Sequence, residues 1–177
     1  GACGTGGILT IAQDRIREIA NERGKNVQVL IYGQELQPET FATCKADLMI
    51  SGDIQAFQYA HGTEMREYIA FDSTISRDGH PGETYDFCIS NPPFGTPWKE
   101  DLKKRGLAET EKKKFTDSRF TLMGANGEEI SFIPDIGDCQ MMFLANNISR
   151  MKDSTELGTR IVEVHNGSSL FTGDAGS

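Results

Sequence analysis

The chain has 177 residues, of which 37% are hydrophobic and 25% charged, as in one ordinary globular domain. No run approaches the length of a membrane-spanning helix, and the N-terminus lacks the layout of a signal peptide. The net charge of −8 argues by itself against a nucleic-acid-binding protein. The four widely spaced cysteines favour reduced thiols in the cytoplasm over a zinc site or a disulfide framework.

Helices and strands alternate along the predicted chain. Apolar residues at helical spacing predict a helix over Ile8–Gly24, and a β-branched run predicts a strand over Val27–Gly33. A second helix is predicted from Pro38, because proline suits the first turn of a helix. Later segments predict strands at 68–71, 85–90 and 160–165 and a helix at 138–151. This alternation is typical of an α/β fold with a parallel sheet covered by helices.

A glycine-rich turn opens the first predicted helix. The stretch "ACGTGG", Ala2–Gly7, lets a ligand approach the backbone and presents the amides of a helix N-terminus to an anion. Glu35 ends the next strand and is able to accept both hydroxyls of a ribose, although a solvated turn acid is the alternative. Asp72 ends the following strand, where it is either a ligand or a cap.

The stretch "SNPPFG", Ser90–Gly95, directly follows a predicted buried strand. Its two prolines stop the strand and fix the backbone, with an amide side chain before them and an aromatic ring after them. In isolation this pattern is also a simple strand terminator. At the carboxyl edge of a sheet, however, an open α/β fold binds its ligands.

The segment from Lys99 to Arg119 holds eight basic and five acidic residues, a local charge of +3 that leaves −11 for the rest of the chain. One interpretation is a solvated, mobile surface segment. The other is a loop that contacts phosphates.

Taken in order, these motifs resemble the adenine-N6 DNA methyltransferases and, more closely, the modification subunit of type I restriction-modification systems. The stretches that carry the resemblance are "ACGTGG", "GQE" at residues 33–35, "DSTIS" at 72–76, "YDFCISNPPFGTPW" at 85–98 and "VHNGSSLFTGDAG" at 164–176. The family's Asp-Pro before the glycine loop, its upstream cofactor motif and its later strands have no counterpart here.

The resemblance implies a Rossmann-like methyltransferase fold, with a mostly parallel sheet, helices on both faces and truncation at both ends. Residues 1–177 would be a partial catalytic domain with a charged insertion at about 99–119. Because the strand before Gly1 is missing, neighbouring strands would have unpaired edges. We therefore expect this stretch alone to be inactive and prone to association.

S-adenosylmethionine is the cofactor that the resemblance implies, with no metal. Cys3–Gly7 would wrap its methionine portion, Glu35 would hold the ribose hydroxyls and Asp72 would accept from the adenine amino group. The full set of implied cofactor-binding residues is Ala2, Cys3, Gly4, Thr5, Gly6, Gly7, Glu35, Leu36, Asp72, Ser73 and Asn91.

The chemistry expected at "NPPF" follows from the weak nucleophilicity of an adenine amine, whose lone pair is delocalised into the ring. The Asn91 side-chain oxygen and the Pro92 carbonyl would accept both amine hydrogens and localise that lone pair. Phe94 would stack on the base after it has flipped out of the duplex. No covalent intermediate with the protein is required.

The expected partners are double-stranded DNA with a flipped adenine, a specificity subunit that reads the DNA sequence, a second modification subunit and a restriction subunit. Two alternatives remain open at this point. Related enzymes use similar motifs to methylate a glutamine amide in a protein or a guanine amine in RNA. The second alternative is that the chain is a non-catalytic piece that binds neither cofactor nor DNA well.

Overall fold

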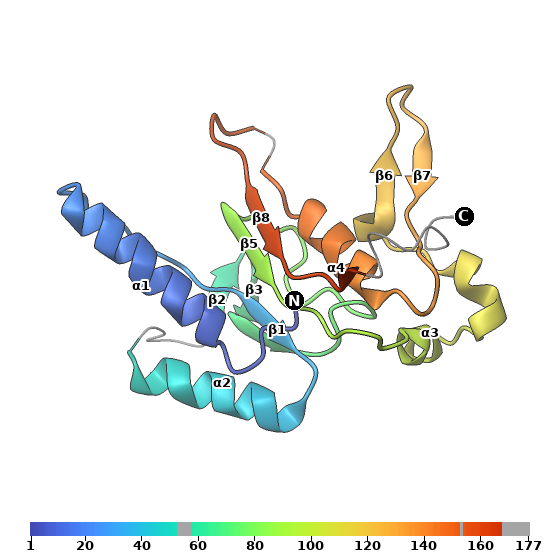
Figure 1. The fold of residues 1–177 in the computed structure, drawn as a ribbon, viewed down its shortest axis with the longest axis horizontal. Coiled ribbons are helices and arrows are strands. Elements are labelled where there is room, and N and C mark those ends of the chain that lie inside the picture. Colours follow the sequence, from blue (N-terminus) through green and yellow to red (C-terminus); the bar gives the residue numbers. More distant parts are fainter. Residues whose placement is uncertain (53–57, 153, 168–177) are drawn as a thin grey trace. The chain divides into compact units, whose positions relative to one another are not determined.

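The computed structural model describes residues 1–52, 58–152 and 154–167, which form two compact units (Figure 1). The N-terminal unit comprises Ala2–Asp72, and the C-terminal unit comprises Gly1 and the residues from Ser73 onward. Among the described residues, none of the helices combines the length and the apolar character that a membrane span needs.

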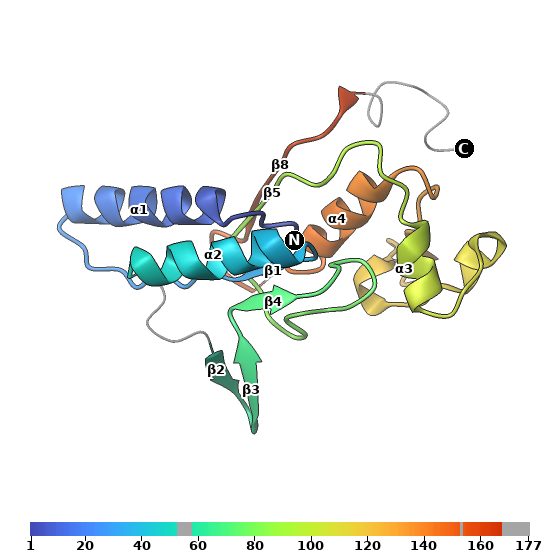
Figure 2. The same cartoon turned by 90° about the horizontal axis from the view of Figure 1, so that it is seen from below.

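The N-terminal unit contains two helices and two strand pairs. Its elements are α1 (Gly7–Glu22), β1 (Gly33–Glu35), α2 (Pro38–Ile50), β2 (Gln58–His61), β3 (Glu64–Glu67) and β4 (Ile69–Phe71). Strands β1 and β4 are parallel, with Gly33 opposite Ile69, whereas β2 and β3 form an antiparallel hairpin. The hairpin projects away from β4 and α2 within this unit (Figure 2). Both predicted helices of this unit are confirmed as α1 and α2.

The core of the N-terminal unit lies between α2 and the β1–β4 pair. Its buried members are Ile31, Cys44, Leu48 and Ile69, against which Cys3, Leu9 and Phe41 pack. The apolar face of α1 is covered only in part, because Ile8 and Ile11 are 47% and 72% exposed. Gln13 is buried instead, and its Nε2 donates to the Val29 carbonyl at 3.0 Å.

The strand expected over Val27–Gly33 is placed too early in the sequence. The observed strand β1 begins at Gly33 and ends at Glu35. A strand is defined by its partner, and the partner β4 offers only three residues for the parallel ladder. The β-branched run before Gly33 therefore contributes Ile31 to the core without joining the ladder.

The C-terminal unit combines one parallel and one antiparallel strand pair with short helices. Its elements are β5 (Phe87–Ser90), α3 (Lys99–Lys104), η1 (Glu109–Lys114), η2 (Ser118–Phe120), β6 (Thr121–Met123), β7 (Glu129–Ser131), α4 (Cys139–Ile148) and β8 (Arg160–Glu163). Strands β5 and β8 are parallel, with Ser90 opposite Glu163, and β6 and β7 are antiparallel. The predictions of β4, β5, β8 and α4 are confirmed, each with shorter ends.

The expected α/β class with parallel strand pairs is confirmed. The described strands form four separate two-stranded sheets, two parallel and two antiparallel, and each strand has only three or four residues. The two hairpins were not predicted, because their sequences are too polar for the period-two signal of a half-buried strand.

The charged segment that follows "NPPFG" packs onto the C-terminal unit through aromatic side chains. Trp98 and Phe115 lie 5.6 Å apart between ring centroids, and Phe115 and Phe120 lie 5.7 Å apart. All three rings are buried, and the Trp98 indole Nε1 donates to the Asp135 carbonyl at 3.0 Å. Most of residues 99–119 are exposed, as the interpretation of a surface segment expects, and the buried Phe115 anchors the segment between two flanking rings.

Arg119 lies at the end of this segment and is only 4% exposed. Its guanidinium donates to the Thr74 carbonyl at 2.6 Å, the Ile75 carbonyl at 3.2 Å and the Asn146 side-chain oxygen at 3.0 Å. Asp117 balances the charge, with 2.8 Å between Nη2 and Oδ2. Burial raises the pKa of Asp117, but the hydrogen bond and charge of Arg119 reverse this effect and hold that pKa below its usual value.

Replacement of Arg119 by methionine should lower the free energy of unfolding by about 3–5 kcal/mol, because the Thr74 and Ile75 carbonyls would stay buried without their donor and Asp117 would keep only Arg105 as an ion-pair partner. Chemical denaturation of the full chain measures the change. The matched control is Arg15→Met, which breaks an exposed ion pair with Glu18 and should cost less than about 1 kcal/mol. Equal losses in the two variants would contradict the prediction.

Candidate functional site

The glycine loop and Glu35 are brought together in the N-terminal unit. The Gly4 N–H donates to Glu35 Oε2 at 2.9 Å, and the N–H groups of Leu36 and Gln37 both donate to Oε1 at 2.9 Å. Glu35 is only 8% exposed. Because a carboxylate has about four acceptor positions, three protein donors leave one for a ligand hydroxyl.

The loop needs glycine for two separate reasons. Gly4 and Gly6 have φ of 60° and 82°, in the left-handed region that other residues adopt at a cost. A Cβ at Gly6 would also lie 2.8 Å from the Cys44 sulfur of α2, which leaves no room for a side chain. The loop is tied to β1 as well, through the Cys3 N–H and the Gln34 carbonyl at 3.1 Å.

The thiols of Cys3 and Cys44 contact each other beneath this loop. Their hydrogen bond lowers the pKa of Cys3, whereas the same bond together with burial raises the pKa of Cys44. A side chain at Gly33 would lie 2.9 Å from the Cys3 sulfur, so the strand approaches the loop closely only because Gly33 has none. Loop, strand and helix are thus packed to a fixed distance in this unit.

The glycine loop ends at the N-terminus of α1, where backbone N–H groups point out of the helix. Gly6 caps the helix without a side-chain hydrogen bond, and the first turn carries no acidic residue. Thr5 and Gly7 are exposed, and a Cβ at Gly4 or Gly7 would meet no atom within 4 Å. The helix dipole favours an anionic group at this end, and the exposed Gly7 leaves room for one to approach the backbone.

The remaining predicted cofactor residues are divided between the two units. Leu36 is exposed next to Glu35, and Asp72 follows β4, where its N–H donates to the Glu35 carbonyl at 3.2 Å. Ser73 belongs to the C-terminal unit, and its Oγ accepts from the Ile75 N–H at 3.3 Å. Asn91 also lies in the C-terminal unit.

The "NPPF" residues follow β5 with the exposure that ligand contact requires. Asn91 is exposed and Phe94 is 48% exposed, whereas Pro92 is fully buried. The Cys139 thiol at the start of α4 donates to the Pro93 carbonyl at 3.2 Å. The prolines are thus anchored in the C-terminal unit, while the amide and the ring remain accessible.

Sequence reasoning missed two buried polar residues that contact Ser90, the residue before Asn91. Glu163 ends β8 and accepts from the Ser90 hydroxyl at 2.8 Å, and Asn147 in α4 donates to the same hydroxyl at 2.9 Å. A signal for Glu163 was present, because an acid interrupts the β-branched run "RIVEVH" near the end of a predicted strand.

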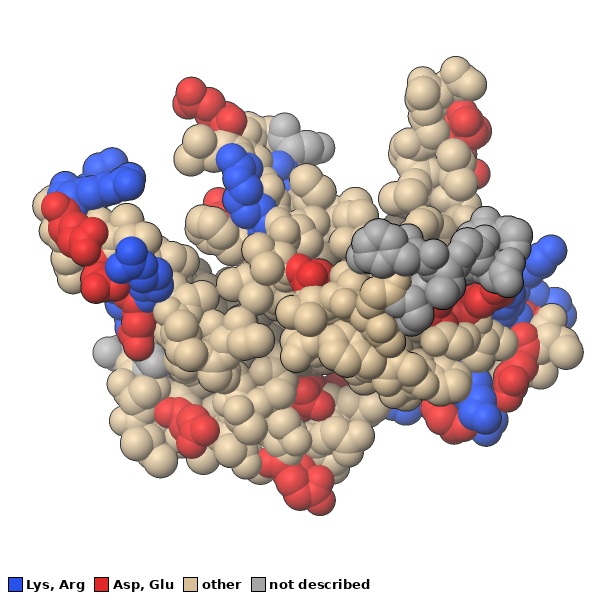
Figure 3. Space-filling view, in the orientation of Figure 1, with Lys and Arg blue, Asp and Glu red and all other residues tan. Residues whose placement is uncertain are grey.

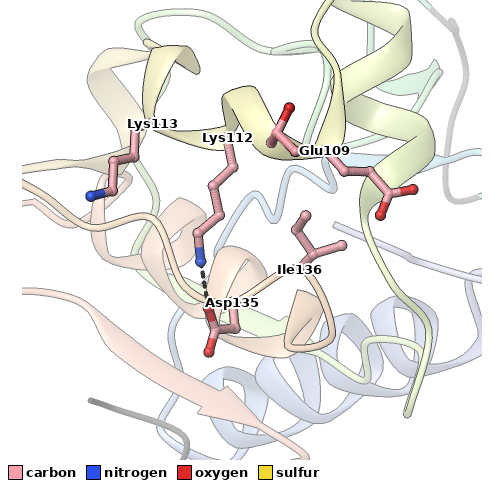
Figure 4. Close-up of a pocket in the computed structure, with 6 residues that line it drawn as sticks. Glu109, Lys112, Lys113, Asp135 and Ile136 are labelled. Carbon is pink, nitrogen blue, oxygen red and sulfur yellow. Dashed lines mark hydrogen bonds and ion pairs between the residues drawn. The ribbon is translucent and has the colours of Figure 1, made fainter.

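The charged segment uses much of its charge in ion pairs. At least five of its eight basic side chains pair with carboxylates, and Figure 3 shows both signs side by side over α3 and η1. A shallow hollow beside η1 is lined by Glu109, Thr110, Lys112, Lys113, Asp135 and Ile136. Lys112 points at Asp135 across it and pairs with that carboxylate (Figure 4). Contact of this segment with phosphates stays a prediction.

The last stretch of the resemblance, "VHNGSSLFTGDAG", lies largely outside the described residues. Only its first four residues, 164–167, are described. Within them the Asn166 N–H donates to the Gln140 side-chain oxygen at 2.7 Å, which joins this stretch to α4.

Comparison with known proteins defines the class. Residues 1–173 match the model of the family described as N-6 DNA Methylase. The chain therefore belongs to the N-6 DNA methylase family of S-adenosylmethionine-dependent adenine methyltransferases, which confirms the resemblance. It is similar to the type I restriction enzyme EcoEI methylase subunit of Escherichia coli, with 28% identity over 120 residues. The similar region is 66% of this chain and 22% of that subunit. No solved structure matches the chain.

Glu35→Gln should loosen the glycine loop, because the amide nitrogen replaces one of the two oxygens that accept backbone N–H groups. If that nitrogen faces Gly4, hydrogen exchange of the Gly4 amide should accelerate by about tenfold or more; the other orientation moves the effect to Leu36 and Gln37. NMR-detected exchange on the full chain measures all three amides. The control is Glu39→Gln at an exposed position of α2. Unchanged exchange at all three amides would show that the Glu35 carboxylate does not hold the loop in place.

Proposed function

We propose that this chain transfers a methyl group from S-adenosylmethionine to the N6 amine of adenine in DNA, as part of a type I modification subunit. The observation that carries the proposal is the "NPPF" stretch at the end of β5, with an exposed amide and ring on a buried proline. Family membership supports the reaction class, and the similarity to the EcoEI methylase subunit supports the restriction-modification context.

The N-terminal unit fits the implied cofactor. When bound, S-adenosylmethionine supplies an electrophilic methyl group. The helix dipole at the start of α1 suits the methionine carboxylate, and the fourth acceptor position of Glu35 suits a ribose hydroxyl. The Asp72 side chain is half-buried next to the strand end that carries Glu35, where it would accept from the adenine amino group.

The C-terminal unit fits the acceptor base. The Asn91 side-chain oxygen and the Pro92 carbonyl would accept the two hydrogens of the adenine amine and localise its lone pair. Phe94 is 48% exposed, and a flipped base would stack on its ring. Each role needs only an acceptor or an aromatic plane, and neither needs a change of protonation state in the protein.

The finer expectations on fold and partners belong to the same proposal. Family membership supports a Rossmann-like methyltransferase fold with a mostly parallel sheet and helices on both faces. The family description supports DNA as the substrate, and we propose the cytoplasm as the location. The partners we propose are a specificity subunit, a second modification subunit and a restriction subunit, and similarity to a methylase subunit of a type I restriction enzyme supports such a complex.

The proposed reaction is tested by transfer of a labelled methyl group from S-adenosylmethionine to three acceptors. The full chain, alone and with its partner subunits, should label adenine N6 in double-stranded DNA and leave RNA and a glutamine-containing release factor unlabelled. Label in RNA guanine or in protein glutamine would move the chain to a different acceptor class. Cofactor binding without label in any acceptor would overturn the proposed activity.

Asn91 and Phe94 should fail in different ways. Phe94→Ala should lose about 1–3 kcal/mol of base stacking, part of which returns when the target adenine faces a mismatch and flips more easily. Asn91→Ala should lower turnover by orders of magnitude with cofactor binding largely intact, and a mismatch should not rescue it. Single-turnover methylation on matched and mismatched duplexes measures both.

Phe94→Tyr is the control for this comparison, because it keeps the aromatic plane and should retain much of the activity. Equal rescue of Asn91→Ala and Phe94→Ala by the mismatch would show that the two residues do not divide the work in this way.

A further inference from the structure

The backbone that leads into Asn91 is held by buried side chains from two other elements. Ser90 is the last residue of β5 and is buried. Its hydroxyl donates to Glu163 Oε2 at 2.8 Å and accepts from Asn147 Nδ2 at 2.9 Å. Its carbonyl accepts from the Val164 N–H at 3.1 Å. The side chain and the carbonyl of Ser90 are thus both fixed.

Glu163 is the centre of this arrangement, and its side chain is only 3% exposed. Besides Ser90, its Oε2 accepts from Asn147 Nδ2 at 2.6 Å, and its Oε1 lies 2.8 Å from His165 Nε2. Burial raises the pKa of Glu163, and the hydrogen bonds and the nearby imidazole offset this only in part. Burial of a carboxyl group costs free energy. Here both hydrogen bonds of Glu163 Oε2 involve Ser90, at the end of β5, or Asn147, which itself contacts Ser90.

Helix α4 reaches both sides of the "NPPF" stretch. Asn147, near its C-terminus, contacts Ser90 before the stretch, and Cys139, at its N-terminus, donates to the Pro93 carbonyl within it. Between these two points Asn91 is exposed. The acceptor atoms of the stretch therefore owe their position to the anchors on either side.

We propose that Glu163 is a positioning residue for the site that receives the target adenine. It holds Ser90 and Asn147 together and thereby fixes the backbone from which the oxygens of Asn91 and Pro92 project. The inference rests on the proposed function, because these oxygens matter only if they receive the amine of the target base. Glu163 acts through Ser90, and small displacements of aligned groups have large effects on rate.

The test is a double-mutant cycle with single-turnover methylation as the readout. Ser90→Ala and Glu163→Ala should each slow methyl transfer by roughly 10- to 100-fold at unchanged affinity for S-adenosylmethionine. The double variant should be no slower than the slower single variant, because both changes remove the same link. Glu163→Gln keeps one oxygen for Ser90 and Asn147 and should recover most of the rate. The control Glu129→Ala changes an exposed acid on β7 and should transfer at the wild-type rate.

A second readout does not depend on activity. Hydrogen exchange of the Val164 amide, which donates to the Ser90 carbonyl, should accelerate in Glu163→Ala and not in Glu129→Ala. Wild-type transfer rates in Glu163→Ala, or losses that simply add in the double variant, would overturn the positioning role. If the wild type labels no acceptor, the proposed function fails and the exchange data decide the inference: unchanged exchange at the Val164 amide would overturn it.

Discussion

Buried hydrogen-bonding groups must be paired, and in both units a glutamate at the carboxyl end of a parallel strand meets this requirement. Glu35 accepts three backbone N–H groups at the end of β1. Glu163 accepts from a hydroxyl and an amide at the end of β8. Strands of three or four residues leave many polar groups without ladder partners, so a carboxylate with several acceptor positions suits such a strand end.

This pairing holds the backbone by buried hydrogen bonds and leaves the residues proposed to contact ligands exposed. Glu35 holds the glycine loop by its backbone, while Thr5 and Gly7 stay exposed at the helix end. The contacts of Ser90 hold β5 by buried atoms, while Asn91 and Phe94 stay exposed. A site that binds a ligand by fixed acceptors and amides needs this arrangement, because preorganised groups lose little entropy when the ligand arrives.

Charge averaged over the chain was a poor guide. The net charge of −8 argued against nucleic acid, yet the chain belongs to a family of DNA methylases. Within the charged segment, Arg119 is buried against carbonyls and Asp117, and Lys112 pairs with Asp135, which lies outside the segment and offsets one of its three excess positive charges. The sign of a sequence average says little about the field at one surface.

The sequence by itself determined what depends on near neighbours. Apolar spacing and terminal glycine or proline predicted α1 and α2, and the order of the motifs from Ala2 to Gly176 indicated the family, because these signals are local. The tertiary structure alone decided where β1 begins, since a strand needs a partner. It also decided that Arg119 is buried and that Glu163 meets Ser90 from 73 residues away. Such contacts follow from strand register and packing, which no local pattern encodes.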